Sequence, residues 1–151
     1  MNPDNIAEIL NDLVQINNDR IANYENAISQ LEAGYDNLTE LFGKMIEESK
    51  GYNAELTKEI DKLHEDVAKG TSGAGKIHRT WMDFKAILTG GDARPILNTC
   101  ETLESAVQRA YEEALEEEGL TAELHLLLTK QKAGLLNSHS HIKQLLEIAT
   151  S

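Results

Sequence analysis

Four long stretches of this chain place apolar residues three and four positions apart, which is the spacing of one face of an α-helix. We expect helices over about residues 3–33, 37–66 and 93–118, and a fourth helix that starts after Thr121. Helices that are apolar on one side must bury those sides against each other. The sequence therefore predicts an all-α protein, a four-helix bundle that forms a single domain over residues 1–151.

The expected helix ends carry ordinary start and stop signals. Gly34 and Gly119 follow the first and third helices, where glycine commonly ends a helix. Asp36 and Thr121 are the expected N-caps of the second and fourth helices. Because both turns are short, the first two helices should be antiparallel, and so should the last two.

The connection between the second and third helices is long and contains a helical pattern of its own. Residues 69–75 hold three glycines among small residues and predict a flexible linker. Residues 76–89 predict a short amphipathic helix, anchored on the bundle by Trp81 and Phe84. Such a helix covers about 20 Å, so this crossover can travel the length of the bundle. The third helix would then start at the same end as the second, which is the ferritin-like arrangement.

Composition excludes several classes of partner. The formal net charge of −12 repels phosphate backbones, so we expect no nucleic acid partner. No run of about 18 apolar residues is present, so we expect no membrane span. The single cysteine, Cys100, cannot form an internal disulfide, and the N-terminus does not resemble a signal peptide. These features predict a cytoplasmic protein.

A di-metal site is the first chemistry to test in a ferritin-like bundle. Such sites take one Glu from each of two helices and a Glu-x-x-His motif from each of the other two. Here Asp61 precedes His64 by three residues, but at a helix end, and no Glu stands three residues before His139 or His141. We therefore assign no metal ligand, no catalytic residue and no cofactor, and keep iron or another divalent metal as the alternative.

The middle of each apolar stripe becomes polar, which predicts a polar layer inside the core. Ser49 and Cys100 share these middle positions. A buried Arg20 would need a partner, and Glu104 is the best available carboxylate. We hypothesise that these two side chains form a buried pair supported by tyrosine hydroxyls; in the alternative, Arg20 turns outward and only its stem lines the core. The predicted polar layer consists of Asn17, Arg20, Tyr24, Tyr52, Glu104, Gln131 and Ser138.

Three stretches, Leu13–Glu25, Lys76–Lys85 and Tyr111–Glu116, carry a family resemblance. They resemble bacterial four-helix-bundle proteins with a ferritin-like domain of unknown function. The resemblance implies a cytoplasmic bacterial protein with a ferritin-like bundle and no assigned activity. Ferritin and rubrerythrin relatives bind two irons, but their ligand pattern is not met here, so no ligand is carried across.

The function expected from these observations is that of a non-enzymatic bundle that acts through protein contacts. The contacts would be with a protein partner or with a second copy in a homodimer. The alternative is an iron-binding or storage protein with a degenerate carboxylate site, to which Glu25 and Glu104 would contribute.

Overall fold

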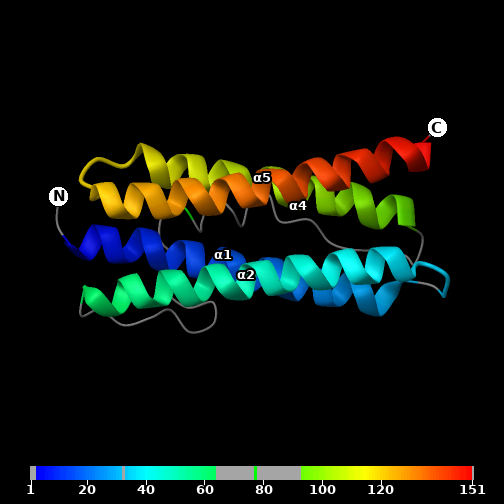
Figure 1. Cartoon of the computed structure of the whole chain (residues 1–151), viewed down its shortest axis with the longest axis horizontal. Coiled ribbons are helices and arrows are strands. Elements are labelled where there is room, and N and C mark those ends of the chain that lie inside the picture. The colour runs from blue at the N-terminus through cyan, green and yellow to red at the C-terminus, as the bar shows by residue number, and fades with distance from the viewer. Residues whose placement is uncertain (1–2, 32, 64–76, 78–92, 151) are drawn as a thin grey trace.

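The computed structural model describes residues 3–31, 33–63, 77 and 93–150. Its four long helices are α1 (Pro3–Gln30), α2 (Asp36–Lys62), α4 (Ala93–Glu116) and α5 (Ala122–Thr150), and the described residues include no strand (Figure 1). The predicted all-α class is confirmed.

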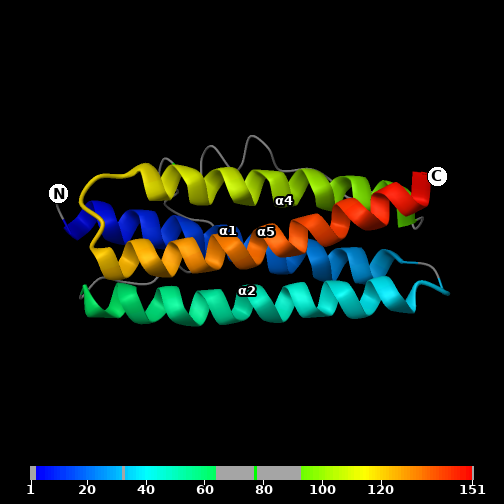
Figure 2. The same cartoon turned by 45° about the horizontal axis from the view of Figure 1, so that its top comes forward.

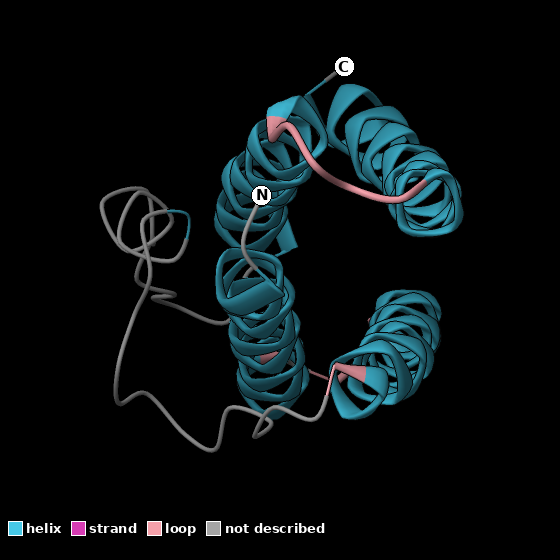
Figure 3. Ribbon diagram, turned by 90° about the vertical axis from the view of Figure 1, so that its left-hand side faces the viewer, coloured by secondary structure: helices cyan, strands magenta, loops and turns pink. Residues whose placement is uncertain are grey.

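The helices form the expected bundle. α1 packs along α2, α4 packs along α5, and α1 also contacts α4. In Figures 1 and 2, α2 and α4 both run from right to left, whereas α1 and α5 run from left to right. Figure 3 shows the same four helices end-on. The third long helix therefore starts at the same end as the second, as the ferritin-like arrangement requires.

The crossover lies almost entirely outside the described residues. This holds for the predicted linker at 69–75, for Trp81 and Phe84, and for all of the predicted helix at 76–89 except Ile77. Ile77 is helical and buried.

The helix ends differ from the prediction by a few residues. α1 ends at Gln30 rather than near residue 33, because the chain turns through Gly34, whose φ is +104°. α2 and α4 also end earlier than expected, and Leu63 is the C-cap of α2.

The predicted N-cap at Asp36 is wrong. Tyr35 holds that position, with no side-chain cap bond, and its carbonyl accepts the N–H groups of Leu38 and Thr39. Asp36 instead lies in the first turn of α2, where its negative charge interacts favourably with the positive end of the helix dipole.

All four helices contribute to one apolar core. The rings of Tyr24 and Phe42 lie 5.1 Å apart at a tilt of 40°, within the range that aromatic pairs favour. Each fully buried large aliphatic side chain contributes about 1.5–3 kcal/mol by leaving water. The aliphatic side chains without exposed surface are Leu10, Leu13, Ile16, Leu56, Ile60, Ile96, Val107, Leu128, Leu135 and Ile142.

None of the described helices combines the length and apolar character needed to cross a membrane.

The predicted N-cap of α5, Thr121, can be tested by substitution. Thr121 Oγ1 accepts the N–H of Leu124 at 3.1 Å, as a capping hydroxyl does. We expect Thr121→Ala to lower the free energy of unfolding by about 1 kcal/mol, measured by urea denaturation. The matched control is Thr129→Ala at an exposed position inside α5, which should not destabilise. Equal losses in both variants would contradict the cap.

Candidate functional site

The centre of the bundle holds a buried ion pair between α1 and α4. Arg20 has no exposed surface and Glu104 is 1% exposed. Arg20 Nε donates to Glu104 Oε2 at 2.8 Å, and Arg20 Nη2 donates to Glu104 Oε1 at 2.9 Å. This two-pronged geometry is the strong form of an arginine–carboxylate contact. The hypothesised pair is present, and the alternative with Arg20 turned outward is wrong.

The guanidinium also contacts α2. Arg20 Nη1 donates to Ser49 Oγ at 2.8 Å and to the carbonyl of Met45 at 3.3 Å, and it lies 3.0 Å from Glu48 Oε1. Burial alone would lower the pKa of Arg20, but the charge and hydrogen bond of Glu104 raise it above its ordinary range. A permanent cation is therefore held between two carboxylates and bonds three helices together.

Tyr24 completes the environment of Glu104. Its hydroxyl donates to Glu104 Oε2 at 2.9 Å, and its ring lies 5.4 Å from the Arg20 guanidinium carbon. Burial, followed by the charge of Glu104, raises the pKa of Tyr24 well above its ordinary value. The tyrosine therefore remains a neutral donor to the carboxylate.

A second branch carries the network to α5. Ser49 Oγ donates to Asn17 Oδ1 at 2.8 Å, and Asn17 Nδ2 donates to Tyr111 Oη at 3.0 Å. Tyr111 Oη then donates to Gln131 Oε1 at 2.7 Å. Gln131 Nε2 reaches the carbonyl of Tyr52 at 3.3 Å. The bonds therefore pass through all four helices without a break.

The layer ends at the side of the bundle where α2 faces α5. Ser138 Oγ donates to Glu48 Oε1 at 3.0 Å, and Glu48 is 22% exposed. Burial, together with the charge and hydrogen bond of Glu48, raises the pKa of Tyr52. The Tyr52 hydroxyl lies so close to Gly134 that any Cβ there would collide with it. Gly134 therefore leaves room for the Tyr52 side chain against α5.

The structure brings all seven predicted layer residues into this network, Tyr52 through its backbone carbonyl and its contact with Glu48. The network also contains Tyr111 and Glu48, which were not predicted from the sequence. Tyr111 follows Glu104 by seven residues, so the two share a helix face, and that spacing was the available signal. Glu48 gave no such signal, because it reads as one more acid on a solvated face.

The carboxylates of this layer do not fit a pair of metal ions. Both oxygens of Glu104 bond Arg20, and one also accepts from Tyr24, while Glu48 bonds Arg20 and Ser138. A guanidinium thus fills the space between the carboxylates. In the part of the chain that the structure describes, no three His, Cys, Asp or Glu side chains gather as metal ligands would.

The residues considered for a metal lie apart. Glu25 and His141 are exposed, and His64 lies outside the described residues. His139 is buried, and its Nε2 lies 3.0 Å from Glu101 Oε1. This pair joins α4 to α5 beside the central layer.

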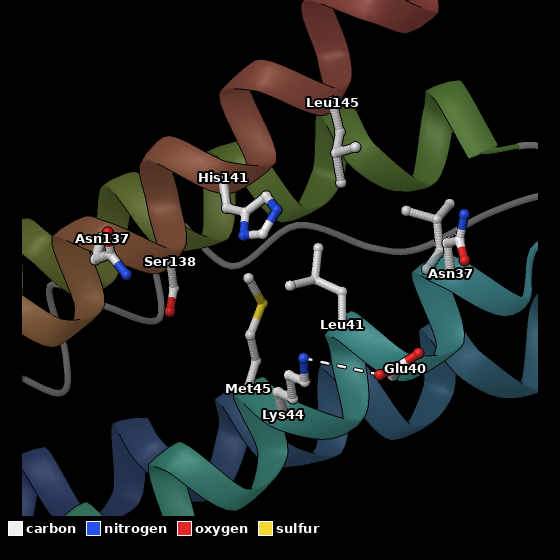
Figure 4. Close-up of a pocket in the computed structure, with 10 residues that line it drawn as sticks. Asn37, Glu40, Leu41, Lys44, Met45, Asn137, Ser138, His141 and Leu145 are labelled. Atoms are coloured by element: carbon white, nitrogen blue, oxygen red, sulfur yellow. Dashed lines mark ion pairs between the residues drawn. The ribbon is translucent and has the colours of Figure 1, made fainter.

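A groove opens between the start of α2 and the end of α5, with a volume of about 540 Å³ (Figure 4). Met45 connects it to the central layer, because the Met45 carbonyl accepts from Arg20. Lys44 and Glu40 form an exposed ion pair of 3.8 Å at its edge. The groove is lined by Asn37, Leu38, Glu40, Leu41, Lys44, Met45, Asn137, Ser138, His141 and Leu145.

Comparisons with known proteins agree with this architecture. The family model described as "Domain of unknown function (DUF2383)" matches residues 5–117. Among solved structures, a mutant of Dps1 from Mycobacterium smegmatis matches with a TM-score of 0.83 and 20% identity, over 95% of this chain and 96% of that chain. At this identity the likeness shows a shared fold. No curated protein matches the chain.

The Arg20–Glu104 pair predicts strong coupling in a double-mutant cycle. Arg20→Met leaves two carboxylates without their cation, and we expect it to lower the free energy of unfolding by about 3–5 kcal/mol. Adding Glu104→Met should recover part of that loss, because the uncompensated charge is removed. Urea denaturation followed by circular dichroism measures all four corners.

The matched control is the exposed pair Lys44 and Glu40, which are four residues apart on α2. Its coupling should be only about 0.3–0.5 kcal/mol. If the losses of unfolding free energy at Arg20 and Glu104 are additive, the predicted coupling is absent.

The buried thiol and tyrosine hydroxyls near the Arg20–Glu104 pair predict that the protein loses stability at alkaline pH. Burial, followed by the charge of Glu104, raises the pKa of the Cys100 thiol to about 12. Because the fold favours the protonated thiol, its contribution is complete below its unfolded pKa of about 8.5 and is lost as pH rises towards the folded value. Tyr24 and Tyr111 act with the same sign, since burial raises their pKa values too.

We therefore expect the urea concentration at the unfolding midpoint to decrease as the pH is raised from about 8 to about 11. At pH 8 the folded protein should react with a thiol reagent far more slowly than the urea-unfolded chain. Equal reaction rates would show that Cys100 is not held as a buried thiol.

Proposed function

The chain belongs to the DUF2383 family, and we propose that it is a non-enzymatic, metal-independent helical bundle that acts through protein contacts. The observation that carries the metal-independent part is the Arg20 guanidinium, which bonds Glu104 in two places and lies against Glu48. A bundle that uses a side-chain cation in this way does not need an ion to neutralise its central carboxylates.

The groups that could perform chemistry support the same proposal. Cys100 and Tyr24 are buried, and their raised pKa values keep them protonated, so neither is an activated nucleophile. Glu104 is fully engaged and lacks access to solvent. The central layer therefore suits a structural role, and the surface remains the place for function.

We keep the cytoplasm as the proposed location. The single cysteine is buried and unable to form an internal disulfide, which is compatible with a reducing compartment. The partner in the proposed contacts is another protein or a second copy of the chain.

Iron binding is the competing proposal, and a solution experiment separates the two. The protein is purified without chelator, its metal content is measured, and ferrous iron is titrated without oxygen by calorimetry. We expect no stoichiometric iron, because Arg20 already occupies the space between the carboxylates.

Glu48→Gln removes a carboxylate of the layer, and Glu25→Gln is the control at an exposed position of α1. Stoichiometric iron that survives Glu25→Gln and is lost in Glu48→Gln would overturn the proposed function.

A further inference from the structure

Exposed apolar side chains are concentrated on one helix. In the described part of the chain, the large hydrophobic residues with exposed side chains are Leu126 at 61%, Leu136 at 50% and Ile148 at 70%, and all three lie on α5. Scattered surface leucines are ordinary, but their restriction to a single helix of a four-helix protein is a local property of that helix.

The same helix differs in charge from the other three long helices. α5 carries three lysines against two glutamates, whereas α1, α2 and α4 each carry more acidic than basic residues. The whole chain has a net charge of −12, so two copies repel each other over most of their surfaces. Among the four long helices, α5 is the one along which that repulsion is smallest.

One line of exposed residues runs the length of α5, and we name it the α5 seam. Its members follow each other at intervals of four, three, four, four, three and four, which keeps them on one helix face. None of them is acidic. The α5 seam consists of Leu126, Lys130, Ala133, Asn137, His141, Gln144 and Ile148, each of them exposed.

The α5 seam is symmetric about Asn137 in its spacing. If two copies of α5 pack antiparallel with a two-fold axis at Asn137, Leu126 of each copy lies opposite Ile148 of the other. Lys130 then lies opposite Gln144, and the small side chain of Ala133 lies opposite His141. Each end of the contact is an apolar pair, and no charge meets a like charge.

A parallel packing of the same faces is less favourable. It would place Lys130 against Lys130 and His141 against His141, so like groups would meet at two positions. The antiparallel arrangement is also the one that a closed two-fold dimer uses, because each copy offers the same surface.

We propose that the α5 seam is the contact surface of an antiparallel homodimer, with a second copy of this chain as its occupant. This inference rests on the proposed function and names the surface and the partner. The seam is about 33 Å long at 1.5 Å per residue. A contact between a single pair of helices is small for a protein interface. The dimer should therefore be weak, forming at high protein concentration and dissociating on dilution.

The contact borders the groove of Figure 4. Asn137 and His141 belong to the α5 seam and also line the groove, so the second copy lies over its α5 edge. Leu136 projects from α5 about 100° away from Asn137 and is not part of the seam. It therefore provides a matched control, being an equally large exposed hydrophobic on the same helix.

A charge-swap experiment on the full chain tests both the surface and the direction of packing. Sedimentation velocity over a range of concentrations gives the dimer Kd for the wild type and the variants. Leu126→Lys alone and Ile148→Glu alone should each weaken the dimer by at least about tenfold, equivalent to 1.4 kcal/mol. Leu136→Glu should leave the Kd unchanged.

The double variant, Leu126→Lys with Ile148→Glu, should recover the wild-type Kd to within about threefold. In the antiparallel dimer each new cation meets a new anion, whereas in a parallel dimer like charges would meet. A second test uses Asn137→Cys, which should form a disulfide-linked dimer on oxidation, while Leu136→Cys should not.

The failures are distinguishable. A dimer that persists in both single variants lies elsewhere and overturns the seam, but it leaves the proposed function in place. A wild-type chain that is monomeric at every concentration also overturns the seam. The proposed function fails separately, if the protein binds stoichiometric iron through Glu48.

Discussion

The two hydrogen bonds from the Arg20 guanidinium to the Glu104 carboxylate are the contact on which the rest of the interior depends. Two charges without access to water are expensive to bury, and they are tolerated only when every remaining donor and acceptor has a partner. Tyr24 and Ser49 meet that need directly, and Asn17 and Tyr111 support Ser49 in turn.

This requirement fixes the relative heights of the helices. An apolar stripe allows one helix to slide against another by a turn at modest cost, since one leucine can replace the next. A two-pronged ion pair between α1 and α4 allows no such shift, and the Arg20 contacts to Met45 and Ser49 hold α2 at the same level. Gln131 then fixes α5 through Tyr111. The polar layer therefore specifies the register of the bundle, while the apolar residues around it supply most of the stability.

The sequence predicted the architecture well because apolar spacing carries most of that information. The four helices and the parallel direction of α2 and α4 follow from stripe lengths and connection lengths, and they are present. The Arg20–Glu104 contact was also predictable, because a buried arginine leaves few choices of partner. Local details were less accessible: Tyr35 replaces Asp36 as the N-cap, since a backbone carbonyl satisfies the turn. Tyr111 was not predicted as a layer residue, because a tyrosine ring at helical spacing gives no indication of where its hydroxyl lies.

In the proposed function the surface, and α5 in particular, makes the protein contacts, while the centre of the bundle supports the fold. That division rests on a guanidinium lying where a ferritin-like bundle could otherwise hold an ion. The most direct measurement is anomalous diffraction at the iron edge from crystals soaked in ferrous iron. We predict Arg20 density between Glu104 and Glu48, with no anomalous peak in the layer. An iron peak between those carboxylates, with Arg20 displaced, would contradict it.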